Sequence, residues 1–188
     1  MGTSAAQRLL TNYVPNVNDC EIAMKLSLVN TSAAQCLWCA RNGTSSNTYT
    51  VFYMGGNSWR FDYRTGQNTV SRSVGANVKC TVKVINNQFF IDDVSLRTVT
   101  ANTFTPGTGL QLFASHTSSS YGGLGNYARY NCYKCYIRSN GQLIKNYLPC
   151  FRVSDGVTGM LDTVNNEFIT SSGTAFVKGT EKVTNILI

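Results

Sequence analysis

The chain has 188 residues and a net charge of +7, but only 13% of its residues are charged. The length favours a single domain, residues 1–188, and Ser, Thr and Asn supply most of the polarity, which suits a strand-rich fold. The basic residues are scattered, which argues against a specific nucleic-acid-binding protein and leaves solubility or weak attraction to anionic cell-surface polymers.

No apolar run is long enough to cross a membrane. The opening "MGTSAAQRLL" lacks the apolar core of a signal peptide, so we expect no signal peptide and leave a cytosolic, a trimmed or a virion protein open.

Short alternating runs separated by turn residues predict strands throughout the chain. In chain order, the expected strands or hairpins cover residues 20–29, 35–42, 47–54, 59–64, 69–74, 78–96, 104–116, 128–150, 159–169 and 174–179. Hairpin turns are predicted at Asn86-Asn87, Asn140-Gly141 and Asn165-Asn166, because Asn and Gly tolerate positive φ. This pattern favours an all-β fold, an antiparallel sandwich or barrel.

The run "WRFDYR" shows the alternation most clearly. It puts Trp59 and two further aromatic residues on one face, and Arg60 and Asp62 on the other. An alternating aromatic face is usually core, and the opposite face is then polar.

Seven cysteines leave at least one thiol unpaired within the chain. "CLWC" and "CYKC" form two CxxC pairs, and a zinc site built from both is one hypothesis. Both pairs lie in strand-like runs, where residues three apart are expected to point to opposite faces. We therefore favour buried free thiols that act as small apolar side chains.

Two segments resemble a known family. They are "CLWCARNGTSSNTYTVFYMGGNSWRFDYRTG" and the closing region from "LQLFASH" through "ARYNCYKCYIRSNGQLIKNYLPCFRVSDGVTGMLDTVNNEFITSSGTAFVKG". They are similar to laminin-G-like domains of the concanavalin A-like lectin/glucanase superfamily, as found in bacterial surface and phage tail proteins. The resemblance covers roughly residues 36 to 179 and implies an antiparallel jelly-roll sandwich of two curved sheets with a sugar-binding or adhesive role.

Catalysis is not expected. Glycoside hydrolysis needs two carboxylates that flank the scissile bond, and no paired acid spacing occurs among the nine acids. Asp155 and Asp162 are weak calcium candidates, and calcium is the only cofactor left open. For Asp155 a type I turn is a sufficient explanation. For Asp162 we favour a structural role in the last hairpin, capping backbone amides or pairing with a base such as Arg152.

Aromatic rings and planar hydrogen-bonding groups are the residue types that bind sugars. The candidate ligand-binding residues are Arg41, Asn42, Tyr53, Trp59, Arg60, Asp62, His116, Tyr121 and Tyr127. The sequence thus predicts a non-catalytic glycan-binding or adhesion module that contacts a glycan or cell-surface polysaccharide, outside the cell, on its surface or on a virion, as a possible homo-oligomer. The alternative is a structural virion protein, a capsid or tail decoration that uses the sandwich for protein contacts.

Overall fold

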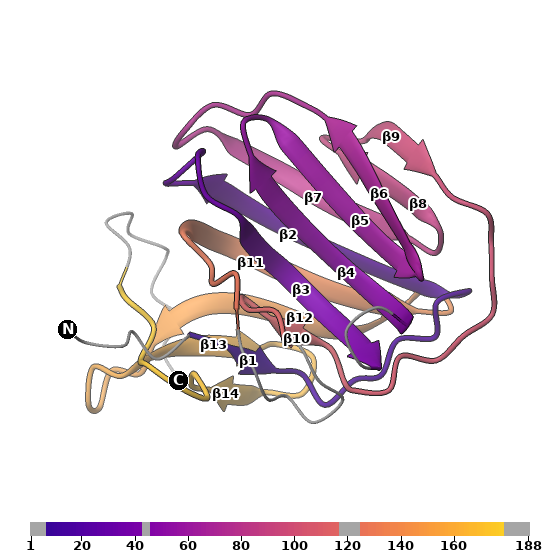
Figure 1. Cartoon of the computed structure of the whole chain (residues 1–188). Helices are drawn as coiled ribbons and strands as arrows, with labels where there is room; N and C mark the ends of the chain where they lie inside the picture. The colour runs from indigo at the N-terminus through magenta and orange to yellow at the C-terminus, as the bar shows by residue number, and fades with distance from the viewer. Residues whose placement is uncertain (1–6, 43–45, 117–124, 179–188) are drawn as a thin grey trace.

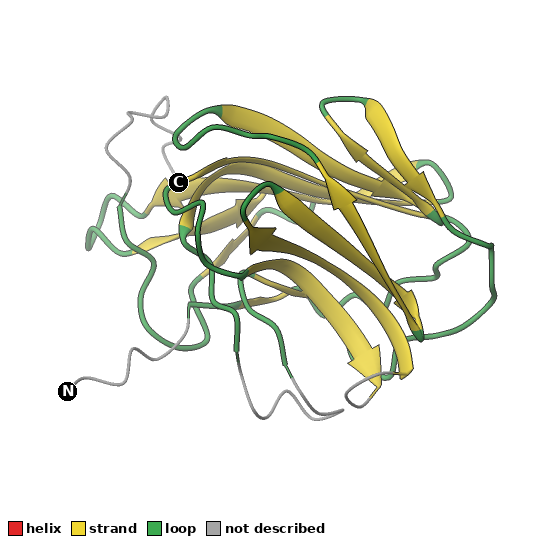
Figure 2. Ribbon diagram, turned by 45° about the horizontal axis from the view of Figure 1, so that its top comes forward, coloured by secondary structure: helices red, strands yellow, loops and turns green. Residues whose placement is uncertain are grey.

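The computed structural model describes residues 7–42, 46–116 and 125–178, and all regular structure in these ranges is β-strand (Figures 1 and 2). Two antiparallel sheets pack face to face, which confirms the predicted all-β sandwich. A search of the described residues finds no helix that could cross a membrane.

Sheet A has the strand order β1-β10-β3-β4-β5-β6. Its strands are β1 (Leu9–Leu10), β10 (Gln111–Leu112), β3 (Gln35–Asn42), β4 (Ser46–Gly55), β5 (Ser58–Arg64) and β6 (Gly66–Ser71). The β3–β4–β5–β6 meander faces the viewer in Figure 1. The weakly alternating β6 lies at the edge, as its polar sequence predicts.

Sheet B has the order β14-β13-β12-β11-β2-β7-β8-β9. Its strands are β14 (Glu167–Ile169), β13 (Thr158–Asp162), β12 (Gln142–Phe151), β11 (Tyr130–Ser139), β2 (Cys20–Leu28), β7 (Lys79–Ile85), β8 (Gln88–Ile91) and β9 (Val94–Thr98). The early strand β2 lies between β7 and the late strand β11, so the chain crosses between the sheets as a sandwich of this kind requires.

The main core fills the space between the sheets. Trp59, Phe61 and Tyr63 of β5 point inward and are buried. Across the core, the Phe61 ring stacks against the Phe89 ring of β8 with centroids 6.1 Å apart. Each such ring stabilises the fold by about 2 to 3 kcal/mol through burial, so period-two alternation accounts for much of the cohesion.

The predicted turns form where left-handed backbone is needed. Asn86 (φ 53°) joins β7 to β8, and the pair Asn140 (φ 49°) and Gly141 (φ 75°) joins β11 to β12. Asn166 (φ 52°) closes the four-residue connection from β13 to β14. These are the residue types that adopt positive φ at the lowest cost.

Two strand predictions need correction. The run 104–116 is predicted as a turn leading into a strand, and that strand is only the two residues of β10, because Phe113 has a φ of 73° that turns the chain out of the extended form. Residues 174–178 form no strand. This segment is held by side-chain contacts instead, since the Phe176 ring packs edge-on against Phe113 with centroids 5.4 Å apart.

Candidate functional site

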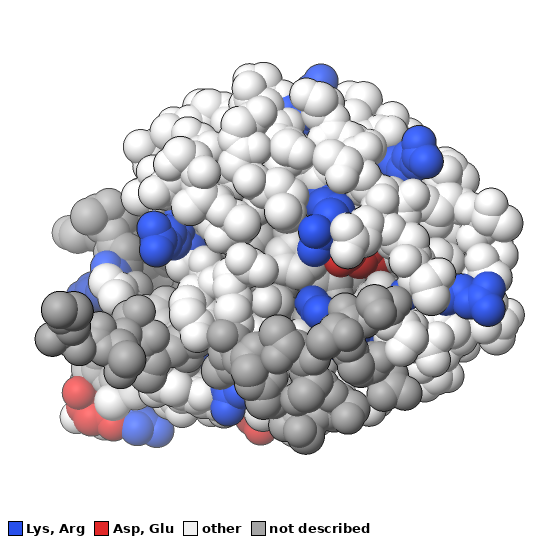
Figure 3. All heavy atoms as spheres, in the orientation of Figure 1, with Lys and Arg blue, Asp and Glu red and all other residues white. Residues whose placement is uncertain are grey.

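The outer face of sheet A carries the polar side chains that alternate with core residues. Because Trp59 and Phe61 point inward on β5, Arg60 and Asp62 point outward. Figure 3 views this face and shows a small acidic area between basic side chains near the middle of the molecule. Asp62 is the only acid in the strands of sheet A, so negative charge on this face is concentrated at one position.

Arg60 and Asp62 form a half-enclosed ion pair. Arg60 Nε lies 2.9 Å from Asp62 Oδ1, and the two side chains are 20% and 8% exposed. The guanidinium also lies over the Phe52 ring, 4.6 Å from its centroid. Nε and Oδ1 are buried atoms that face each other, so a ligand on this face would contact the exposed remainder of the Arg60 side chain.

The charge of Asp62 depends on pH near neutrality. Burial raises the pKa of this carboxyl to about 6, although the positive charges of Arg60 and Arg41 oppose the shift. Arg41 projects from β3 and is buried, so it belongs to the same charged group as Asp62.

Cys39 lies beside this group. Arg41 Nε donates to Cys39 Sγ at 3.3 Å, and the Thr50 hydroxyl donates to the same sulfur at 3.4 Å. Burial would raise the pKa of the Cys39 thiol, but hydrogen bonds from Cys36 and His116 and the charge of Arg41 lower it well below its ordinary value. The floor of the site is therefore polar as well as basic.

His116 is a buried part of this floor rather than an exposed loop residue. Its side chain has no exposed surface, and its Nε2 lies 3.1 Å from the Thr108 hydroxyl. Thr108 donates in turn to the carbonyl oxygen of Arg41 at 3.1 Å. His116 thus positions the strand that carries Arg41, and direct contact between His116 and a ligand, as the sequence suggested, is incompatible with its burial.

Sequence reasoning missed the side chains that a β-bulge brings here. The register of β3 shifts between Cys36 and Trp38, so Cys36 and Cys39 pack with Phe52 in one cluster on the same face. A second shift, after Cys132, turns Cys132 and Cys135 together toward the main core. The expectation that residues three apart would point to opposite faces was therefore wrong for both CxxC pairs.

The two pairs nevertheless lie in different clusters, so their four thiols cannot share one zinc ion. All seven cysteines are free thiols, and five of them are buried: Cys20, Cys36, Cys39, Cys80 and Cys135. This confirms the preference for free thiols in the interior. No group of three or more metal-binding side chains is found in the described part of the chain.

Two of the predicted aromatic contacts are buried, and a third falls outside the described residues. Tyr53 and Trp59 have no exposed surface, and their polar atoms are used inside: the Tyr53 hydroxyl donates to Thr31 O at 2.9 Å and Trp59 Nε1 to Arg72 O at 3.0 Å. The prediction that Tyr53 and Trp59 stack on a sugar was therefore wrong, because the alternation of their strands points both rings into the core. Tyr121 lies outside the described residues.

The two remaining candidates lie at the border of this face. Tyr127 is partly buried just before β11. Asn42 is described only through its backbone, which pairs with Ser46 at the end of β3. The structure therefore pairs Arg60 with Asp62 directly and places Arg41 near enough to act on Asp62 through its charge, with His116 linked to Arg41 through Thr108.

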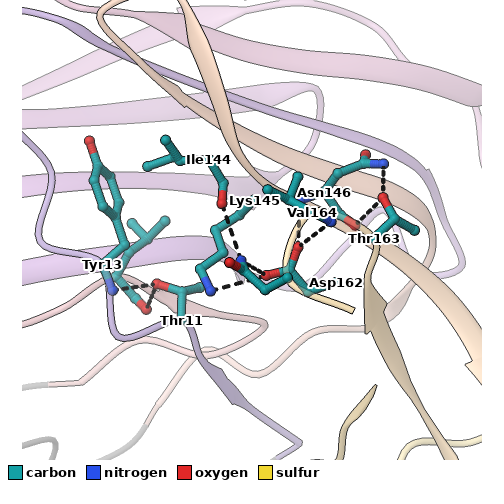
Figure 4. A network of polar contacts seen from close by, with 10 residues as sticks. Thr11, Tyr13, Ile144, Lys145, Asn146, Asp162, Thr163 and Val164 are labelled. Atoms are coloured by element: carbon teal, nitrogen blue, oxygen red, sulfur yellow. Dashed lines mark hydrogen bonds and ion pairs between the residues drawn. The ribbon is translucent and has the colours of Figure 1, made fainter. Parts of the chain in front are cut away.

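Asp162 has the structural role that the sequence favoured. Its carboxylate is fully buried, and Oδ1 accepts hydrogen bonds from the backbone amides of Asn146 (3.1 Å) and Val164 (3.2 Å), as Figure 4 shows. Oδ2 accepts from Asn165 Nδ2 at 2.6 Å and pairs with Lys145 Nζ at 3.0 Å. The basic partner is Lys145 of the adjacent strand β12, and not Arg152 as expected.

These contacts do not fit calcium. Four donors occupy both oxygens of Asp162, which leaves no free lone pair for a cation. Burial alone would raise the pKa of Asp162, but these hydrogen bonds lower it. Asp155 forms an ion pair with Arg152 and accepts the backbone amide of Val157 at 3.1 Å, as a turn residue does. Both carboxylates are therefore explained by the fold alone.

Comparisons with known proteins agree with the architecture. No protein-family model matches the sequence, and no curated protein matches it. A solved structure of the Ruminococcus gnavus IT-sialidase CBM40, a carbohydrate-binding module bound to α2,3-sialyllactose, matches with a TM-score of 0.50 and 12% identity, over 77% of this chain and 90% of that chain. A second structure of that module matches over the same shares with 12% identity and a TM-score of 0.49. The likeness shows a lectin-like β-sandwich fold.

Proposed function

We propose that this chain is a non-catalytic carbohydrate-binding module that holds a glycan on the outer face of sheet A. The observation that carries the proposal is the Arg60–Asp62 pair on the outer face of sheet A, in which the Arg60 side chain keeps 20% of its surface exposed to a ligand. Sugar hydroxyls both donate and accept, so one hydroxyl can satisfy a guanidinium N–H and another a carboxylate oxygen.

We assign an acidic sugar as the preferred ligand class. Arg60 presents a guanidinium at the surface and Arg41 adds positive charge behind it, so a sugar carboxylate has a planar, bidentate partner. The structurally similar module from Ruminococcus gnavus was solved with a sialylated trisaccharide, which supports testing this class first.

We expect binding without cleavage because the outer face of sheet A carries too few carboxyl groups. Glycoside hydrolysis needs two carboxyl groups about 5 to 10 Å apart, one on each side of the scissile bond. The strands of sheet A supply Asp62 alone. Since Tyr53 and Trp59 are core residues, the contact is polar and shallow, and we expect each site to be weak and to act through avidity in a homo-oligomer.

We place the module on a phage tail or bacterial surface protein, and so outside the cell, on its surface or on a virion. This part of the proposal rests on the sequence resemblance to laminin-G-like domains. The alternative remains an assembly protein of a virion, which would use the same face of sheet A for protein contacts.

Calorimetric titration with α2,3-sialyllactose, with lactose as the neutral comparison, tests the proposal. We expect Arg60→Gln to weaken sialyllactose binding about 10- to 100-fold, the cost of losing a charge-assisted pair. Arg97→Gln, an exposed arginine of β9, is the matched control and should bind as the native chain does. If no glycan binds and the chain forms a stable oligomer that covers the outer face of sheet A, the assembly function replaces this one.

A further inference from the structure

The outer face of sheet B carries a second concentration of positive charge. Side chains from β2, β7 and β11 that alternate with core residues point away from the sandwich. The basic face, as we call it, consists of Lys25, Lys79, Lys83, Lys134 and Arg138. All except Lys83 are exposed. Since the core separates the two sheets, this face lies on the opposite side of the molecule from Arg60.

The strand register forces like charges together on this face. Lys25 of β2 lies directly opposite Lys134 of β11, and both side chains are exposed. Like charges that face each other across an antiparallel pair destabilise a sheet. Within the described part of the chain neither lysine forms an ion pair with an acid. The fold therefore retains a repulsive arrangement that a bound polyanion would relieve.

The acids near the basic face are already engaged. Asp93 pairs with Lys83, and Glu21, which accepts the Tyr136 hydroxyl at 2.7 Å, lies opposite Arg138 in the register of β2 and β11. Asp92, at the β8–β9 turn, accepts the backbone amide of Thr81 at 2.8 Å. None of these contacts neutralises Lys25 or Lys134, so the positive charge remains available to an external partner.

Aromatic rings on this face are covered by cations. Lys79 Nζ lies 4.5 Å from the centroid of Tyr133, and Lys134 and Arg138 lie 5.8 Å and 5.5 Å from that of Tyr136. Single-stranded nucleic acids bind by stacking bases on open rings, and these rings have a cation on one face. The face of an eight-stranded sheet is also too wide to enter a duplex groove as a helix does. The geometry favours a polyanion that is bound through its charges alone.

We propose that the basic face binds an anionic polysaccharide, one with sulfate or carboxylate groups along an extended chain. The spacing of about 5 Å between strands and 7 Å between alternate residues gives a lattice of cations that a repeating anionic chain can follow. This site is independent of the glycan site proposed on sheet A, and each can be present without the other.

Heparin, a sulfated polysaccharide, is the probe. We expect the native chain to bind it with strong salt dependence, and Lys25→Gln with Lys134→Gln to weaken binding about 30-fold at physiological salt, since each lysine near an anionic surface contributes about tenfold or less. The matched control is Arg64→Gln with Arg72→Gln, which removes the same charge at the end of β5 and just after β6 of sheet A. Arg60→Gln should leave heparin binding unchanged. The double lysine variant should also melt at a slightly higher temperature without heparin, because the repulsion is removed.

Three results would overturn the proposal. The first is an absence of heparin binding by the native chain. The second is an equal loss of heparin affinity in the arginine control, which would show that binding depends on the net charge of the chain and not on the basic face. The third is single-stranded DNA of equal charge binding more tightly than heparin, which would assign the face to nucleic acid instead.

Discussion

Replacing Asp162 with alanine removes the acceptor for four donors at once. The backbone amides of Asn146 and Val164 lose their partner at Oδ1, and Asn165 and Lys145 lose theirs at Oδ2. The amides belong to β12 and to the turn after β13, and both of these hydrogen bonds are part-buried. Lys145, whose side chain is 19% exposed, can reorient toward solvent.

The size of the effect follows from these contacts. Each buried donor left without a partner costs about 1 to 3 kcal/mol, and because these two are part-buried we expect the amides to cost about 2 to 4 kcal/mol together. Lys145 adds little to this, since it can turn to solvent. For a chain of this length we expect the melting temperature to fall by about 4 to 16 °C. The exposed Asp155→Ala is the control and should leave the melting temperature nearly unchanged.

The pH dependence separates this account from simple loss of packing. The folded state lowers the pKa of Asp162 below the ordinary value of 3.8. Its carboxylate therefore stabilises the fold above about pH 4, and this contribution is lost as the pH falls through the lower folded pKa. In urea titrations the native chain and Asp162→Ala should differ most at pH 7 and converge toward pH 2. A difference below 1 kcal/mol at pH 7, or one that does not change with pH, would refute the reasoning.

Four further outcomes are expected. The pKa of Asp62 is raised to about 6, so the folded state prefers the protonated acid and the free energy of unfolding should fall by about 3 kcal/mol as the pH rises from 4 to 6. In urea titrations Asp62→Asn should abolish this pH dependence. Sialyllactose should bind more tightly at pH 5 than at pH 7.5, because protonation of Asp62 removes a negative charge that repels the sugar carboxylate. Calorimetry of the native chain and of Asp62→Asn at both pH values checks this. Trp59→Ala should cost about 3 to 5 kcal/mol, while Trp59→Phe should retain glycan affinity, because the ring is core. Gly141→Ala should cost about 1 kcal/mol in thermal unfolding through its φ of 75°, since no neighbouring atom obstructs the added methyl group.

The sequence alone was sufficient for the architecture and for the last hairpin. Alternation of period two placed Trp59 and Phe61 on one face of β5 and Arg60 on the other, and Asn and Gly pairs marked the turns. Both signals are local, since they depend only on side-chain direction and on φ. The structural role of Asp162 was also predictable. Its basic partner, Lys145, was not, because the sequence of neither strand shows that β12 pairs with β13.

The site depended on information that no single strand contains. Sequence reasoning chose Arg60 and Asp62 correctly as outward residues, yet it also chose Trp59, whose inward direction the same alternation implies. A bulge in β3 inserts one residue into the strand and reverses the alternation. Cys36 and Cys39 therefore share a face, whereas in a regular strand they would point to opposite faces.

What the amino-acid order determined by itself was therefore the class of fold, the turns and the facing of regular strands. Only the tertiary structure decided which polar groups meet: Thr108 and His116, far along the chain, lie under Arg41, and Lys25 of β2 faces Lys134 of β11. The physical reason is that local patterns set the direction of each side chain, whereas its neighbours depend on strand order and register across the assembled sheets.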